Sequence, residues 1–252
     1  MHKFFAKPLF LGKKVLFLPE CHSTNDELMN LAKNPHEAEG LIVYSNDQTS
    51  GKGQRGNQWL AESGKNILMS LLLRPKFLDP KNQFYLNLIA GLAIVDAIES
   101  LTDGNVTLKW PNDVYLNGKK LAGILIENNL RGSNLESSVV GIGLNVNQKS
   151  FNMPKATSLR LETGQKYDLQ EILEELTVQI ERWYLKLKSG ENDVILSKYH
   201  ELLMWRGEQR KFKVKENEFL GEIIGIDEHG RLAINHHHGL HYYGIKEVEF
   251  IS

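Results

Sequence analysis

The chain has 252 residues, of which 41% are hydrophobic, and this predicts a globular protein with a sizeable core, built as one large domain or as a main domain with a small appendage. Its 30 Lys and Arg residues nearly balance 31 Asp and Glu residues, which argues against a dedicated nucleic-acid-binding protein, because such proteins usually carry a basic excess. Cys21 is the single cysteine, so an internal disulfide and a cysteine-rich zinc cluster are excluded, and a reducing compartment fits.

The N-terminal part of the chain predicts short strands, one helix and a long polar loop. Thr24, with Glu27 three residues later, forms a capping box that starts a helix, and the helix ends near Pro35 because proline disfavours helical geometry in its predecessor. Residues 46–65 are polar and glycine-rich, and loops of that length are usually lids or binding loops. The expected strands are residues 15–18, closed by Pro19, residues 41–44 and residues 66–73.

A helix over residues 86–101 is apolar nearly all round, which predicts that it packs on a sheet. Its most apolar run, residues 86–98, is shorter than the ~18 residues of a membrane span and contains Asn87 and Asp96. The first nine residues carry charge and a proline where a signal peptide would be apolar. We therefore expect a cytoplasmic protein with no membrane partner.

The second half of the chain predicts hairpins, two helices and, from about residue 207, a series of short strands joined by turns. Asn117-Gly118 is a strong hairpin signal, because both central positions of a type I′ turn need positive φ. The mixture of helices and antiparallel hairpins indicates an α+β fold with a main domain at residues 1–206 and a small β domain at residues 207–252. The expected strands are residues 107–110, 114–116, 119–127, 137–146, 210–215, 219–226, 231–235 and 239–243, and the expected helices are residues 169–188 and 193–203.

A glycine-rich segment begins at Gly51 and matches the spacing of a dinucleotide-binding fingerprint by letters alone. No helix start follows these glycines, and Gly56 is not followed by the Lys-Ser or Lys-Thr of a phosphate-binding P-loop. What remains is a basic loop in which Lys52 and Arg55 supply charge and the glycines let the backbone approach an anion. The alternative is a solvated turn with two surface cations.

A second group of candidates surrounds the hairpin at Asn117. Strand alternation places Lys120 on the face that Ala122 and Ile124 bury, where a lysine either reaches out to solvent or meets an anion. Gly123 in mid-strand indicates a bulge or a close approach of a ligand. Asn112-Asp113 could hold Mg²⁺, which prefers one or two carboxylates together with phosphate oxygens, or could simply cap a turn.

Together these motifs resemble the biotin protein ligases, also called biotin–[acetyl-CoA-carboxylase] ligases. The resemblance rests on motifs that follow the family's order, and the small C-terminal β unit is similar to the family's SH3-like domain. It implies a fold like the class II aminoacyl-tRNA synthetases, with a mixed β-sheet and flanking helices. The motifs are Ser23-Thr24-Asn25, Gln48, residues 51–56 with Trp59, residues 109–113, residues 120–123 and residues 141–145.

The resemblance also implies a two-step reaction and a role for each motif. Biotin and ATP would form biotinyl-5′-AMP and pyrophosphate, and a lysine of a biotin carboxyl carrier protein would then take the biotinyl group. Lys120 would be the catalytic residue that steadies the α-phosphate and the biotin carboxylate. The biotin-binding residues would be Ser23, Thr24, Asn25, Gln48, Gly51, Lys52, Gly53, Gln54, Arg55, Trp59, Lys120 and Gly123; the nucleotide-binding residues would be Lys52, Arg55, Asn112, Asp113, Lys120 and Asn145, with Asp113 on Mg²⁺.

Two departures from the family pattern bear on function. Many members carry arginine where this chain has Gln54, and Gln carries no charge with which to grip a phosphate. About fourteen residues precede the first expected strand, too few for the DNA-binding domain of bifunctional members, so we expect a monofunctional ligase that binds no nucleic acid. A homodimer is compatible with an open sheet edge. The alternative functions are a lipoate–protein ligase-like adenylating enzyme and a non-catalytic carrier-protein binding module.

Overall fold

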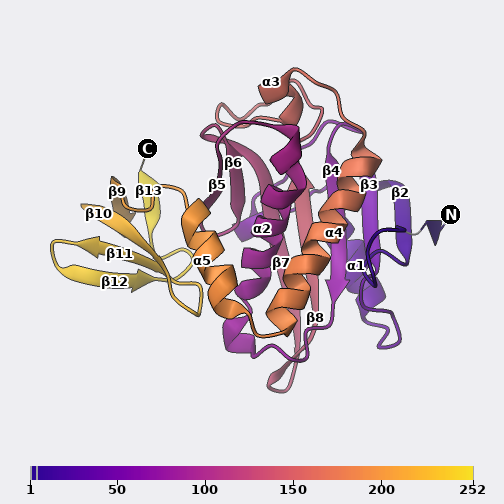
Figure 1. The fold of residues 1–252 in the computed structure, drawn as a ribbon, viewed down its shortest axis with the longest axis horizontal. Coiled ribbons are helices and arrows are strands. Elements are labelled where there is room, and N and C mark those ends of the chain that lie inside the picture. The colour runs from indigo at the N-terminus through magenta and orange to yellow at the C-terminus, as the bar shows by residue number, and fades with distance from the viewer. Residues whose placement is uncertain (1, 4, 252) are drawn as a thin grey trace.

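A large mixed β-sheet with helices on both faces forms most of the molecule, and a smaller antiparallel sheet lies at one end (Figure 1). The structure is a computed structural model that describes residues 2–3 and 5–251, with the backbone alone for His2, Lys3 and Arg55. The α+β architecture expected from the sequence is confirmed.

The large sheet has eight strands, and β2 and β3 form its parallel pair while the other neighbours are antiparallel. Strand β2 continues through Pro19, so the predicted end of the strand there was wrong; Leu18 and Glu20 on either side pair with β3, and Pro19 falls between the paired positions. In sheet order the strands are β1 (His2–Lys3), β2 (Val15–Cys21), β3 (Ile42–Gln48), β4 (Ile67–Leu73), β8 (Asn134–Leu144), β7 (Lys119–Arg131), β6 (Asp113–Leu116) and β5 (Val106–Lys109).

One face of this sheet is covered by α2 (Tyr85–Ile98), α4 (Leu169–Lys188) and α5 (Asn192–Leu202) (Figure 1). Helix α2 packs on β5, β6 and β7 with α4 on one side of it and α5 on the other (Figure 1), and it buries side chains all round, as its sequence predicts. By length and composition the helical stretch Pro80–Leu101 could cross a membrane, yet 72% of its most apolar window is buried inside the protein, which is typical of a core helix. The short helix α3 (Leu159–Thr163) follows β8 and was not predicted.

The opposite face of the sheet carries α1 (Thr24–Ala32), which packs Leu28 and Ala32 against Val43, Leu72 and Val139. The predicted capping box was wrong. Ser23 is the N-cap residue and its side chain makes no capping hydrogen bond among the described residues, whereas Thr24 already lies inside the helix. Helix α1 therefore begins with its first polar side chains buried against the sheet.

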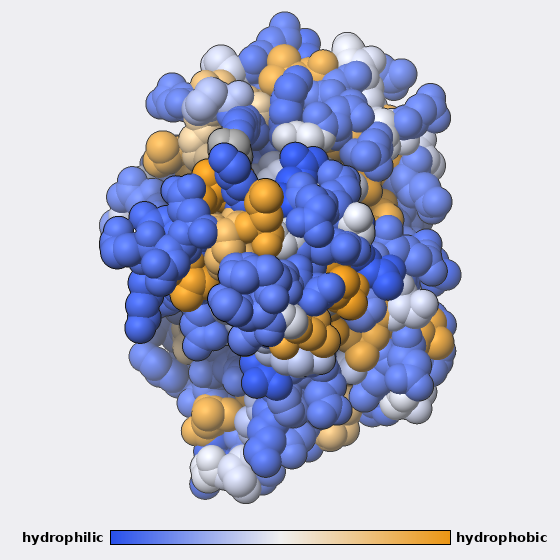
Figure 2. Space-filling model, turned by 90° about the vertical axis from the view of Figure 1, so that its left-hand side faces the viewer, coloured by the Kyte–Doolittle hydropathy of each residue, from blue (hydrophilic) through white to orange (hydrophobic). Residues whose placement is uncertain are grey.

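The C-terminal strands form a five-stranded antiparallel sheet. Its contacts with the main domain include two hydrogen bonds: Trp110 Nε1 donates to Gly230 O at 2.9 Å in a buried position, and His200 Nε2 on α5 accepts the Ile226 N–H at 2.9 Å in a partly buried one. Figure 2 views the molecule from this end, where the surface is mainly hydrophilic with separate apolar patches. In sheet order the strands are β12 (Gly239–Tyr243), β11 (Leu232–His236), β10 (Asn217–Ile226), β9 (Gln209–Val214) and β13 (Glu249–Ile251), and β13 was not predicted.

Candidate active site

A bulge in β7 decides which face of the sheet receives Lys120. Val114 pairs with Ala122, whereas the next residue, Tyr115, pairs with Lys120, so Leu121 is an extra residue in β7. Such an insertion reverses the alternation of side chains on its two sides. Lys120 therefore lies on the α1 face of the sheet and not on the buried face of Ala122. The predicted shared face of Lys120, Ala122 and Ile124 was wrong, and the bulge is the reason.

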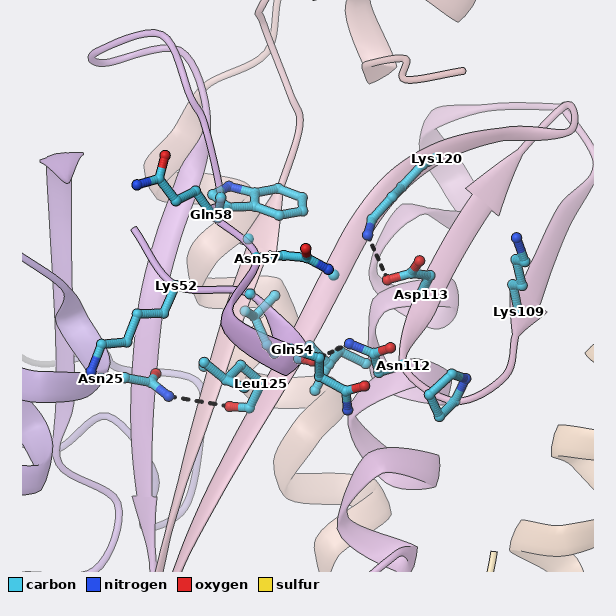
Figure 3. Close-up of a pocket in the computed structure, with 18 of the residues that line it drawn as sticks. Asn25, Lys52, Gln54, Asn57, Gln58, Lys109, Asn112, Asp113, Lys120 and Leu125 are labelled. Atoms are coloured by element: carbon cyan, nitrogen blue, oxygen red, sulfur yellow. Dashed lines mark hydrogen bonds and ion pairs between the residues drawn. The ribbon is translucent and has the colours of Figure 1, made fainter. Parts of the chain in front are cut away.

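An open cleft of about 440 Å³ lies on the α1 face, where the start of α1, the glycine-rich loop and the C-terminal sheet meet (Figure 3). It brings together most of the predicted residues. Predicted residues that line it are Ser23, Thr24, Asn25, Gln48, Lys52, Gly53, Gln54, Trp59, Asn112, Asp113, Lys120 and Gly123. Gly51 and Asn145 are buried and do not line it, and the Arg55 side chain lies outside the described part of the chain.

One end of the cleft is a buried, fully polar corner at the start of α1. Gln48 Oε1 accepts from the Thr24 N–H at 2.7 Å and from the Thr24 hydroxyl at 3.1 Å. The Ser70 hydroxyl lies 2.8 Å from Thr24 Oγ1 and 2.6 Å from Asn25 Oδ1. The Asn25 amide also donates to Glu127 Oε2 at 2.8 Å. Because the Thr24, Asn25 and Gln48 side chains are each held by a hydrogen bond, this corner can present amide and hydroxyl groups in fixed positions to a polar ligand.

The floor of the cleft is made of glycines that leave room for larger side chains. A Cβ at Gly141 would lie 2.1 Å from Asn25 Oδ1. A Cβ at Gly123 would lie 2.9 Å from Trp59 Cζ3, and one at Gly143 would lie nearer still to the same indole. Any side chain at these positions would displace Asn25 or Trp59, which explains a glycine in the middle of β7 and two in β8.

The glycine-rich loop folds over one side of the cleft. It contains a short 3₁₀ turn, Gln54–Gly56, and a bridge between Lys52 and Gln58. The Lys52 ammonium forms an ion pair with Asp26 on α1, and this hydrogen bond raises the pKa of Lys52. Lys52 therefore ties the loop to α1, while Gln54 extends toward Asn112 (Figure 3). The phosphate contact predicted for Lys52 would require the Lys52 side chain to leave Asp26.

The other end of the cleft is charged. Lys120 Nζ lies 2.7 Å from Asp113 Oδ1 and 5.6 Å from the centre of the Trp59 ring. Asn112 is held by the neighbouring strand, because its side-chain amide donates to Ile124 O at 2.7 Å and its own carbonyl accepts the Ile124 N–H at 2.9 Å. Asn112 thus fixes the position of Asp113, and Asp113 fixes the ammonium of Lys120 (Figure 3).

Several residues that line the cleft, or that support its lining as Ser70 does, were not identified from the sequence. Ser70 sits at the centre of β4, where its neighbours are all buried, and the pattern reads only as core strand. Glu249 and Phe250 of β13, with Val248 just before the strand, also line the cleft, and no short-range motif connects them to residues 23–25 or 120. Lys109 also lines the cleft; it stands in a recognised motif, but no role was assigned to it.

Magnesium was predicted at Asp113. Among the described residues no group of three or more His, Cys, Asp or Glu side chains could hold a metal ion. A single carboxylate beside an open cleft suits an ion that arrives with a nucleotide and keeps its phosphate and water ligands. The donor set therefore fits a nucleotide-borne Mg²⁺ and not a resident metal.

Comparison with known proteins identifies the family. The pattern of the biotin/lipoate A/B protein ligase family matches residues 18–145. The chain is 32% identical to biotin–[acetyl-CoA-carboxylase] ligase of Paracoccus denitrificans, over 92% of this chain and 99% of that protein. It is 30% identical to the bifunctional ligase/repressor BirA of Bacillus spizizenii, over 94% of this chain and 74% of that protein.

Solved structures agree with the sequence comparison. The biotin protein ligase of Aquifex aeolicus in complex with biotin and ATP superposes with a TM-score of 0.80 at 30% identity, over 94% of this chain and 98% of that one. The chain belongs to the biotin/lipoate A/B protein ligase family. The predicted resemblance to biotin protein ligases and the predicted fold are thereby confirmed.

Proposed function

We propose that this protein is a biotin–[acetyl-CoA-carboxylase] ligase that forms biotinyl-5′-AMP from biotin and ATP and transfers the biotinyl group to a lysine of a biotin carboxyl carrier protein. The observation that carries the proposal is the cleft itself, which joins a buried polar corner at Asn25 to the Lys120–Asp113 pair. The relatives named above support biotin over the lipoate alternative and an enzyme over a non-catalytic binding module.

In the first step the biotin carboxylate attacks the α-phosphorus of ATP, a new P–O bond forms, and the bond to the β-phosphate breaks with release of pyrophosphate. The corner of Thr24, Asn25 and Gln48 would hold the ureido ring of biotin by hydrogen bonds. Lys120 would lie between the carboxylate and the α-phosphate, where its charge opposes the repulsion of two anions and stabilises the charge that builds on phosphorus. The Asp113 carboxylate would keep that ammonium in place.

In the second step the amine of the acceptor lysine attacks the carbonyl carbon of the mixed anhydride, AMP leaves, and the amine loses a proton. The loop from Gly51 to Trp59 would cover the adenylate and keep water from hydrolysing it. Mg²⁺ bound through Asp113 and the nucleotide would neutralise phosphate charge. Arg55 and Asn145 remain predicted nucleotide contacts, and Gly51 remains a predicted contributor to the biotin pocket.

The cellular setting is proposed from the same chemistry. The acceptor is a carrier protein, and the near-neutral net charge gives no reason to expect nucleic-acid binding. A cytoplasmic location suits the single cysteine, and a homodimer through an open sheet edge stays a prediction.

Transfer to a carrier domain tests the proposal. The purified protein, MgATP and biotin should add one biotinyl group to a carrier domain, and the mass increase should vanish when the target lysine is replaced by arginine. Lipoate or octanoate in place of biotin should give no transfer. Modification by lipoate alone would assign the lipoate function instead, and no modification with any acid would leave a binding module.

A further inference from the structure

Lys109 ends β5 at the edge of the cleft, and its ammonium is surrounded by three aromatic rings. Its Nζ atom lies 5.3 Å from the centre of the Tyr115 ring, 5.5 Å from that of Trp205 and 5.3 Å from that of Phe250. The Tyr115 hydroxyl lies 3.5 Å away. The nearby carboxylate of Asp113 pairs with Lys120 and not with Lys109 (Figure 3). Lys109 therefore lines the cleft with an ammonium that makes cation–π contacts with three aromatic rings.

The three rings come from separate parts of the fold. Tyr115 belongs to β6 of the large sheet, Trp205 follows α5, and Phe250 belongs to β13 of the C-terminal sheet. Phe250 also packs against Trp205 with ring centres 5.7 Å apart and meets Phe212 edge-on at 5.6 Å. The position of the Lys109 ammonium thus depends on how the C-terminal sheet is seated.

Trp205 adopts an uncommon backbone conformation to take its place. Its φ is +64°, a value that bulky residues rarely adopt and that is retained when the surrounding structure requires it. The Arg210 guanidinium lies over the same ring, 5.0 Å from its centre. The indole of Trp205 therefore contacts two cations, Arg210 and Lys109.

Among the residues that the structure describes, the Lys109 ammonium forms no ion pair with a carboxylate, and Asp113 pairs with Lys120. Burial lowers the pKa of Lys109, and the positive charges of Lys120 and Lys155 lower it further, while Asp113 acts in the opposite sense. Cation–π contacts stabilise a charge only modestly, so a phosphate entering the cleft would be a stronger partner. Lys109 and Lys120 lie on either side of Asp113, so two lysines and one carboxylate face the charged end of the cleft (Figure 3).

We propose that Lys109 binds the β- and γ-phosphates of ATP and the pyrophosphate that leaves, and that Phe250 and Trp205 are positioning residues that hold its ammonium at the cleft. The inference rests on the proposed function for the identity of the nucleotide reaction. It adds that the C-terminal sheet takes part in polyphosphate binding through Phe250, without a hydrogen-bonding group of its own. Lys120 keeps the α-phosphate, so the two lysines serve different parts of the nucleotide.

Binding of inorganic pyrophosphate, measured by calorimetry on the full chain, tests the inference without turnover. Lys109→Met should weaken binding about tenfold or more, and Phe250→Leu about fivefold, in line with the loss of an ion pair and of one ring face. Phe250→Tyr keeps the ring and should bind as the wild type does. Phe219→Leu is the matched control, because Phe219 packs on Phe212 in the same sheet, and it should leave binding unchanged.

A double variant separates positioning from general damage. If Phe250 acts through Lys109, Phe250→Leu should weaken binding little further once Lys109→Met is present. In turnover assays both single variants should raise the KM for MgATP and leave the Kd of biotin within about twofold. Equal effects of Phe250→Leu and Phe219→Leu, or unchanged pyrophosphate affinity in Lys109→Met, would overturn the inference. Loss of pyrophosphate binding in Lys109→Met, from a wild type that makes no biotinyl-AMP, would contradict the proposed function while supporting the role of Lys109.

Discussion

The side chain of Asn25 occupies the space that a side chain at residue 141 would need. The amide oxygen of Asn25 lies 2.1 Å from where a Cβ of Gly141 would stand, and the amide nitrogen lies 3.1 Å from it. Helix α1 and strand β8 can approach this closely only because residue 141 is glycine. The buried polar corner of the cleft depends on that approach.

Gly141→Ala should therefore damage biotin binding selectively. The added methyl group would push the Asn25 amide out of place, and loss of one well-placed hydrogen bond weakens binding by about tenfold. The expected result is a rise of at least about tenfold in the Kd of biotin, with a smaller change in the affinity for MgATP, both measured by calorimetry. Gly244→Ala is the control, because its Cβ would lie 3.3 Å from the flexible Glu247 side chain. Equal biotin affinity in Gly141→Ala and wild type would contradict this account of the corner.

Ser70→Ala tests the support behind the same corner. The Ser70 hydroxyl lies within hydrogen-bond distance of both Thr24 and Asn25, and its removal should loosen both side chains. Groups that orient a ligand-binding side chain typically change affinity by about tenfold, and a lost buried hydrogen bond lowers the free energy of unfolding by about 1 kcal/mol. Biotin titration and chemical denaturation measure the two effects.

Ser138→Ala is the matched control for Ser70→Ala. Ser138 is buried on β8, and its hydroxyl makes no hydrogen bond to the described residues. The same loss of one oxygen atom should leave biotin affinity unchanged and should not lower stability. If the two variants lose biotin affinity equally, the Ser70 hydroxyl has no special role in positioning Thr24 and Asn25.

Acid should weaken the contact between α5 and the C-terminal sheet. Burial, and secondarily the Arg206 guanidinium, lowers the pKa of His200 below its ordinary value, and its Nε2 must stay unprotonated to accept the Ile226 N–H. The folded state therefore binds this proton less readily than the unfolded chain. The stabilising contribution is complete above the unfolded-state pKa of about 6.5 and is lost as the pH falls below it toward the folded-state pKa.

His200→Gln tests this pH dependence, because the amide oxygen of glutamine can accept the same hydrogen bond and does not titrate. Between pH 7.5 and pH 5.5 the wild type should lose more of its Tm than His200→Gln does. His236, whose pKa is lowered mainly by burial and then by neighbouring histidines, titrates in both proteins and cancels in the comparison. Identical losses of Tm would show that His200 does not carry the effect.

The sequence predicted the elements well where a local pattern determines them. The bounds of α4 agree with the predicted helix at residues 169–188, and Asn117 and Gly118 have the positive φ values that the predicted turn requires. Short-range patterns failed where distant segments compete with them. Thr24 has capping-box spacing, yet its hydroxyl bonds to Gln48, and Pro19 does not end β2 because β3 pairs on both sides of it.

The candidate site was predictable as a set of residues and not as an arrangement. Strand alternation placed Lys120 on the wrong face of the sheet, because one extra residue, Leu121, reverses the alternation of side chains. No sequence motif predicts that bulge. Ser70 and Phe250 stand in strands that read as ordinary core or edge, and their contribution appears only once β4 and β13 are placed beside the cleft.

Pyrophosphate release from MgATP is the most direct test of the central claim, because it reports activation of the acid before any carrier protein is needed. Wild type should release pyrophosphate with biotin and not with lipoate or octanoate. Lys120→Ala should lose at least about a hundredfold of that rate, as expected when a charge that stabilises the transition state is removed. Release with lipoate alone would show that the protein activates lipoate and not biotin. No release with any acid, from folded protein, would contradict the assignment of the cleft as an adenylating site.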